Sequence, residues 1–117
     1  MQYLLPMPTY LMLSILGPDG FATVRDQPAR IREVNSEVES MGARVVSQYA
    51  LLGQYDFATV IEVPDEQVMI RITTTLAARG TLKTHTLAAI PIEDYITALG
   101  SGVGRGRDAA PTDGFDD

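Results

Sequence analysis

The sequence contains no cysteine. This absence excludes a disulfide framework, a thiolate nucleophile, an iron–sulfur cluster and a zinc site built on cysteine. Histidine occurs once, at His85, so the side chain that most readily titrates near neutral pH is available at a single position. The glycine-rich run 100–106 lacks the Lys-Ser/Thr ending of a phosphate loop, and no spacing resembles a known metal site. We therefore expect neither a cofactor nor a bound metal.

Positive charge and long apolar runs are also scarce. Nine Lys and Arg against 15 Asp and Glu give a formal net charge of −6, which is opposite to the balance of nucleic-acid-binding proteins. The apolar stretch 1–16 is interrupted by Pro6 and Pro8 and lacks the basic start of a signal peptide. It is also shorter than the roughly 20 apolar residues of a membrane span. We expect a cytoplasmic protein that binds neither nucleic acid nor membranes.

The length of 117 residues fits one domain with a real hydrophobic core. We assign residues 1–99 to this domain and residues 100–117 to a flexible tail rich in glycine and aspartate. The tail holds two arginines and four aspartates, so its Arg-Gly steps favour a solvated segment over an RNA-binding one. A docking peptide built on Phe115 is the alternative for this segment.

Apolar periodicity and turn residues divide the domain into alternating elements. Residues 17–20, Gly-Pro-Asp-Gly, are typical of a turn, and Gly42 follows an apolar three-four-three spacing that predicts a helix from Pro28. Gly53 is expected to serve as a turn or bulge residue with positive φ between two paired strands. The predicted order is strand 8–16, helix 28–41, strands 43–52 and 54–63, helix 66–79, strand 81–90 and a short helical segment after Pro91.

This order predicts an α+β, ferredoxin-like βαββαβ domain with a four-stranded antiparallel sheet and two helices on one face. Strand alternation places Tyr55, Phe57 and Thr59 on one side of the third strand, with Asp56 and Ala58 on the other. Neither side is uniformly polar, so the second sheet face needs a cover that no remaining segment is long enough to provide. A second copy of the chain is the expected cover, which makes the protein a homo-oligomer.

Four short motifs carry a resemblance to a known family. They are Met7-Pro8-Thr9-Tyr10, Arg25-Asp26-Gln27-Pro28-Ala29-Arg30, Leu52-Gly53-Gln54-Tyr55-Asp56-Phe57 and Glu62-Val63-Pro64-Asp65. Together they resemble the GYD family over about residues 8–96. With the later Thr84-His85-Thr86 they are also similar to the effector-binding domain of the leucine-responsive regulators, although the DNA-binding helix-turn-helix is absent. Both resemblances imply a dimeric α+β barrel that encloses small-molecule pockets, and neither implies a reaction.

The candidate site residues gather around the Gly-x-Tyr-Asp element. The candidate ligand-binding residues are Tyr10, Gln54, Tyr55, Asp56, Thr59 and His85. His85 and Asp56 are also the candidate catalytic bases, because proton abstraction requires such a group in a dry pocket.

Each candidate also has a structural interpretation. Tyr55 is equally suited to the core of a subunit interface, and His85 to an ordinary strand position. The Asp56 carboxylate is favoured to accept backbone N–H bonds that hold the hairpin or the adjacent helix. Arg25 and Arg30 flank the first helix predicted here, where they either bind an anionic ligand or remain solvated beside acidic neighbours.

Three functions remain open from the sequence. The leading hypothesis is a homo-oligomeric protein that binds a small anionic or amino-acid-like molecule. The second is a cofactor-independent enzyme, isomerase or oxygenase-like, that uses His85 or Asp56 as a base. The third is a structural or partner-binding module whose apolar face serves assembly.

Overall fold

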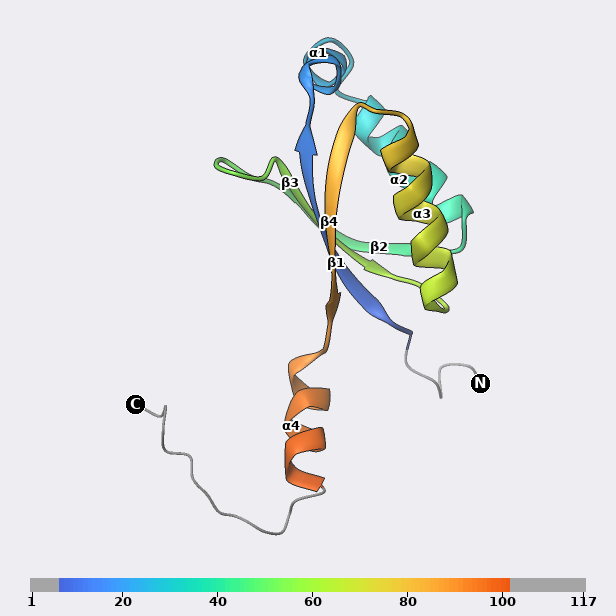
Figure 1. The fold of residues 1–117 in the computed structure, drawn as a ribbon, viewed down its shortest axis with the longest axis vertical. Helices are drawn as coiled ribbons and strands as arrows, with labels where there is room; N and C mark the ends of the chain where they lie inside the picture. The colour runs from blue at the N-terminus through green and yellow to red at the C-terminus, as the bar shows by residue number, and fades with distance from the viewer. Residues whose placement is uncertain (1–6, 102–117) are drawn as a thin grey trace.

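The computed structural model describes residues 7–101. Its four strands form one antiparallel sheet in the order β2-β3-β1-β4 (Figure 1). The strands are β1 (Thr9–Leu16), β2 (Arg44–Ala50), β3 (Phe57–Glu62) and β4 (Leu82–Ala89). This order, with β1 and β3 in the middle of the sheet, confirms the predicted ferredoxin-like α+β fold.

Two helices, α2 (Arg30–Ser40) and α3 (Glu66–Ala78), lie on the same side of the sheet (Figure 1). Asp65 caps the start of α3, because its carboxylate accepts a hydrogen bond from the Val68 backbone N–H at 3.1 Å. Gly42, after α2, has a φ of 108°. That left-handed conformation is the one predicted for a glycine that ends a helix.

A helix that the sequence did not predict follows β1. Residues 17–20 were expected to form a turn, but α1 (Pro18–Asp26) begins there. Proline suits the first position of a helix because its missing N–H would have no partner there. Gly20 is buried so close to the start of β4 that an added Cβ would stand 2.5 Å from the Thr81 carbonyl oxygen. Pro18 therefore starts a helix, and Gly20 allows that helix to approach the Thr81 backbone closely.

The strands β2 and β3 are shorter than predicted, and residues 51–56 form the connection between them. Gly53 has a φ of 145°, so its predicted positive φ is confirmed. The register shift lies elsewhere, between Val45 and Ser47 in β2. Of the two roles expected for Gly53, turn or bulge, the structure therefore supports the turn.

The hydrophobic core fills the space between the helices and one face of the sheet. Its buried side chains are Met12, Val38, Ala43, Ile61, Val63, Val68, Met69, Ile72 and Leu76. The opposite face, here called the outer sheet face, carries the alternate strand residues. These are Leu11, Leu13 and Ile15 of β1, their partners Ala58 and Val60 of β3 and Lys83, His85 and Leu87 of β4, and Ser47 and Tyr49 of β2, which pair with Val60 and Ala58. No helix of the described chain lies on this face (Figure 1), so its apolar residues are uncovered, as the sequence predicted.

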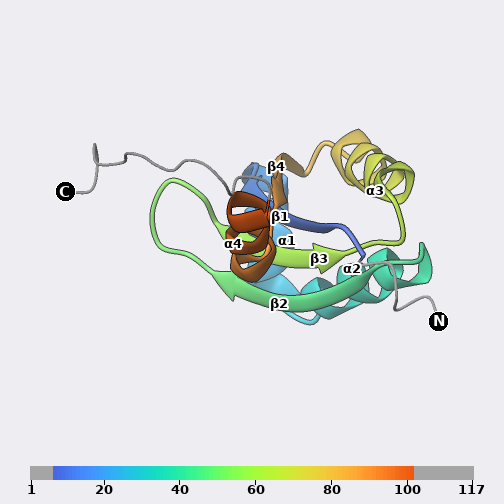
Figure 2. The same ribbon diagram turned by 90° about the horizontal axis from the view of Figure 1, so that it is seen from below.

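The last helix, α4 (Ile92–Ser101), extends away from the sheet after Pro91 (Figures 1 and 2). It continues two residues beyond the predicted domain boundary at residue 99. Residues 102–117 of the predicted tail lie outside the described part of the chain. Among the described residues, no helix is long and apolar enough to cross a membrane.

Candidate functional site

A cavity of about 270 Å³ lies between the helix-facing side of the sheet and helices α1, α2 and α3. Most of its wall is apolar, with Met12 and Ile61 from the sheet, Val34 and Val38 from α2 and Leu76 from α3. A cavity with apolar walls and a few polar groups is the usual form of a small-molecule site. The ferredoxin-like layers thus leave a concave site inside a single chain.

The polar groups of the cavity form a small network. The Asn35 Nδ2 donates to Gln48 Oε1 at 2.7 Å, and Gln48 Nε2 donates to Asn35 Oδ1 at 3.2 Å and to Thr59 Oγ1 at 3.0 Å. Thr59 is only 2% exposed, and Ser14, on the neighbouring strand, is 4% exposed. Ser14 lines the cavity, whereas the buried side-chain oxygen that lacks a hydrogen-bond partner among the described residues, Thr86 Oγ1, does not. The interior of the cavity therefore presents the Ser14 hydroxyl to a ligand.

Two arginines supply the only charge along the cavity wall within the described residues. Arg30 opens α2 and Arg79 follows the last residue of α3. Arg30 Nη1 lies 3.1 Å from Glu33 Oε1, and Arg79 Nη2 is paired with the Glu37 carboxylate, which joins α3 to α2. The Arg79 guanidinium lowers the pKa of Glu37, and Arg30 contributes a smaller effect in the same direction. Both cations therefore lie close to one carboxylate at the edge of the cavity.

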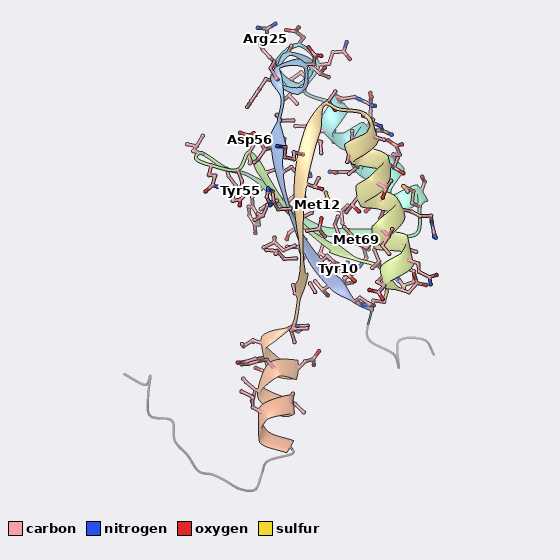
Figure 3. The ribbon with its side chains drawn as sticks, viewed as in Figure 1. Tyr10, Met12, Arg25, Tyr55, Asp56 and Met69 are labelled. Atoms are coloured by element: carbon pink, nitrogen blue, oxygen red, sulfur yellow. The ribbon has the colours of Figure 1, made fainter. Side chains whose placement is uncertain are left out.

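Asp56 connects the 51–56 segment to β1 (Figure 3). Its Oδ2 accepts a hydrogen bond from the Leu16 backbone N–H at 2.8 Å, and its own N–H donates to the Ser14 carbonyl at 2.8 Å. Its carbonyl accepts from Leu51 N–H at the same distance. These bonds fit the structural interpretation of this aspartate, which was that its carboxylate holds the hairpin.

Tyr55, labelled in Figure 3, lies on the outer sheet face. The centroids of the Tyr55 and His85 rings are 5.5 Å apart and the ring planes meet at 74°, a T-shaped arrangement. The sequence placed Tyr55 and Thr59 on one side of a strand, and this was wrong. The strand alternation begins only at Phe57, because Asp56 turns its carboxylate to the Leu16 backbone. Tyr55 thus sits on the face opposite the cavity that Thr59 lines.

The structure separates the six candidate ligand-binding residues. Thr59 alone of them lines the cavity, while Tyr10 packs against the core and Gln54 is exposed in the 51–56 segment. Tyr55 and His85 meet on the outer sheet face, and the Asp56 carboxylate is bound to the Leu16 backbone. The residues 7–101 hold no group of three or more His, Asp or Glu that could bind a metal ion.

Sequence reasoning missed most of the polar residues of the cavity, among them Ser14, Asn35, Gln48 and Arg79. A signal for Ser14 existed, since it alternates with Met12 and Leu16 and so falls on the buried side of β1. A polar side chain at such a position marks either a satisfied core group or a site. The other three come from separate elements whose convergence no local pattern shows.

The sequence matches the GYD domain family over residues 10–99. A protein of Thermus thermophilus named "Glutamine synthetase and cystathionine beta-lyase binding protein" is 50% identical over 94 residues. The similarity covers 80% of this chain and 99% of that relative. No solved structure matches the chain.

Proposed function

The chain belongs to the GYD family, and from that premise we propose that it is a homo-oligomer that binds a metabolic enzyme. The proposed partner is an enzyme of the kind named for the relative, glutamine synthetase or cystathionine β-lyase. The observation that carries the proposal is the presence of two surfaces with exposed apolar side chains that nothing in the described chain covers. The proposal places the protein in the same compartment as those enzymes.

The first surface is the outer sheet face, which we assign to self-association. Leu87 is 51% exposed and Tyr49 is 62% exposed at opposite edges of this face, with Leu11, Leu13 and Val60 between them. Contiguous exposed apolar surface of this kind is uncommon on monomers and marks an interaction site. A second copy offers a matching surface, because a two-fold interface joins the same patch of both chains. The exposed apolar residues and the symmetry argument support the homodimer, which we state as a proposal.

The second surface is one side of α4, which we assign to the enzyme. Ile92, Tyr95, Ile96 and Leu99 follow each other at helical spacing and are between 53% and 65% exposed. A helix of ten residues that contacts no core is marginal in water, so this apolar stripe requires a partner to stabilise it. An amphipathic helix that projects from a domain is suited to the apolar groove of another protein.

Titration of the purified chain into purified glutamine synthetase, and separately into cystathionine β-lyase, tests the assignment by calorimetry. Ile96→Asp is expected to weaken binding at least tenfold, because a charge enters the apolar stripe of α4. Ile70→Asp is the matched control, since Ile70 is 58% exposed on α3 and belongs to neither surface. The proposal fails if the unaltered chain binds neither enzyme at micromolar concentration, or if both variants weaken binding equally.

Small-molecule binding is a second candidate function, and the cavity with its polar network supports it. The cavity lies on the helix side of the sheet, apart from both apolar surfaces, so this function is compatible with the first. The cofactor-independent enzyme has less support. His85 lies on the outer sheet face and does not line the cavity described above, and Asp56 is held by the Leu16 backbone.

A further inference from the structure

We propose that the cavity binds a small carboxylic acid that carries no ammonium group, such as a 2-oxo acid with an apolar body. The proposal rests on the second candidate function, small-molecule binding in this cavity, and names its ligand class. Three features of the wall carry it: two arginines, the absence of acidic residues from the described wall, and the hydroxyl of the buried Ser14 in the interior.

Arg30 and Arg79 form the carboxylate end of the site. Each uses one guanidinium nitrogen in its pair with a glutamate, Nη1 in Arg30 and Nη2 in Arg79. A guanidinium has five N–H donors, so both retain donors for a bidentate bond with a ligand carboxylate. This positive edge belongs to a chain with a formal net charge of −6. The charge of the described wall therefore comes from Arg30 and Arg79, whose glutamate partners do not line the cavity.

The wall discriminates against an ammonium group. Glu33 and Glu37 hold the two arginines but do not line the cavity, and no Asp or Glu of the described residues does. Bringing an ammonium out of water without a carboxylate partner is costly. Asn35 Oδ1 and Gln48 Oε1 each already accept a hydrogen bond from the amide nitrogen of the other residue. An amino acid therefore gains less from this site than the matching 2-oxo acid.

The interior suits a short apolar body with one acceptor. The Ser14 hydroxyl lines the cavity and can donate a hydrogen bond to a keto oxygen. Met12, Ile61 and Leu76 then contact the apolar part of the ligand. The volume of about 270 Å³ has room for a ligand of about the size of an amino acid.

Calorimetric titration with three matched probes tests the proposal: α-ketoisovalerate, valine and isovaleramide. They share a branched apolar body and differ in the charged or polar end. We expect α-ketoisovalerate to bind at least tenfold more tightly than either of the others. Arg30→Gln and Ser14→Ala should each weaken this binding several-fold. Arg25→Gln is the control, because Arg25 is paired with Asp26 but does not line the cavity.

Arg79 needs a second variant, because its loss also breaks the bond between α3 and α2. Glu37→Gln breaks the same bond and keeps the guanidinium, so it should bind the oxo acid at least as tightly as the unaltered chain. Arg79→Gln should weaken binding tenfold. Equal losses in the two variants would assign the effect to the helix packing and overturn the role of Arg79 in binding the carboxylate.

The remaining outcomes distinguish a failure of the proposed ligand class from a failure of small-molecule binding, the function on which that class rests. If valine binds as tightly as α-ketoisovalerate, the exclusion of the ammonium group is wrong. If isovaleramide binds as tightly, the arginines do not select an anion, although small-molecule binding stands. If none of the three probes binds at millimolar concentration, the proposed ligand class is overturned, while thermal-shift screening with uncharged metabolites still tests small-molecule binding itself.

Discussion

The Asp56 carboxylate accepts a hydrogen bond at 2.8 Å from the backbone N–H of Leu16, forty positions earlier in the chain. The bond joins the segment that precedes β3 to the end of β1. It lies beyond Ser14 and Phe57, which are the last paired residues of these two strands. The Asp56 N–H continues the connection to the Ser14 carbonyl. The aspartate of the Gly-x-Tyr-Asp element is thus a structural residue that fixes where Tyr55 and Phe57 point.

Asp56→Ala should destabilise the fold by about 1–3 kcal/mol, because the partly buried Leu16 N–H loses its acceptor. Asp56→Asn should cost less, since the amide oxygen can accept the same bond. Urea unfolding followed by circular dichroism gives both free energies. Asp26→Ala, which removes an exposed partner of Arg25, is the control and should change stability little. Equal effects of Asp56→Ala and Asp26→Ala would contradict the structural role.

Gly20→Ala should destabilise the protein by about 1–3 kcal/mol, because the new methyl group would overlap the Thr81 carbonyl oxygen at 2.5 Å. The contact is with the backbone of Thr81, so α1 must move away from the start of β4. Gly17→Ala is the matched control, since its Cβ would meet the same oxygen at an ordinary 3.7 Å. Thermal unfolding of both variants measures the difference, and similar midpoints would contradict the close approach of α1.

The pair between Glu37 and Arg79 predicts an acid-sensitive contribution to stability. The pKa of Glu37 in the folded chain is lowered from its ordinary value of 4.5, chiefly by its hydrogen bond with Arg79. The unfolded chain therefore takes up the proton at higher pH than the folded chain does. The stabilisation is present above the ordinary pKa and is lost as the pH falls through the lowered folded value.

Glu37→Gln should accordingly lower the melting temperature at neutral pH and have a smaller effect in strong acid. Melting temperatures measured for both proteins across this range give the comparison. Arg79→Gln introduced into the Glu37→Gln chain should add little further pH dependence, because the pair is already broken. A melting difference that stays constant down to strongly acidic pH would show that Glu37 acts through packing and not through its charge.

Leu87→Asp should convert the proposed oligomer into a monomer of 12.7 kDa, because a desolvated carboxylate would enter the interface between the paired faces. Sedimentation velocity measures the mass at several protein concentrations. Ile70→Asp, on the helix side of the molecule, should leave the mass unchanged. A monomeric unaltered chain at tens of micromolar would remove self-association from the proposed function.

Local patterns predicted much of this fold. Each strand and the helices α2, α3 and α4 were predicted, because alternation and helical spacing of apolar residues reflect which face of an element is buried. Helix α1 was missed for a physical reason. Gly-Pro-Asp-Gly is typical of a turn, and only the approach of Gly20 to the Thr81 backbone shows why glycine is needed inside a helix.

The site was predicted less well than the fold. Strand alternation assumes that the strand extends to Tyr55, and a single hydrogen bond from Leu16 to Asp56 ends it earlier. Thr59 was singled out as a candidate and does line the cavity, whereas Arg79 carries no local signal at all. Its importance comes from its position at the end of α3, across from α2.

By itself, the amino-acid sequence determined the order of strands and helices, the apolar character of both sheet faces and the absence of cysteine chemistry. These properties depend on composition and on neighbours within a few residues. The tertiary structure alone decided that Tyr55 joins His85 on the outer face and that Arg30, Arg79 and Ser14 surround one cavity. This convergence depends on how α2 and α3 pack over the sheet. Packing between distant segments produces no periodic pattern of residues in the sequence, so the sequence alone could not predict it.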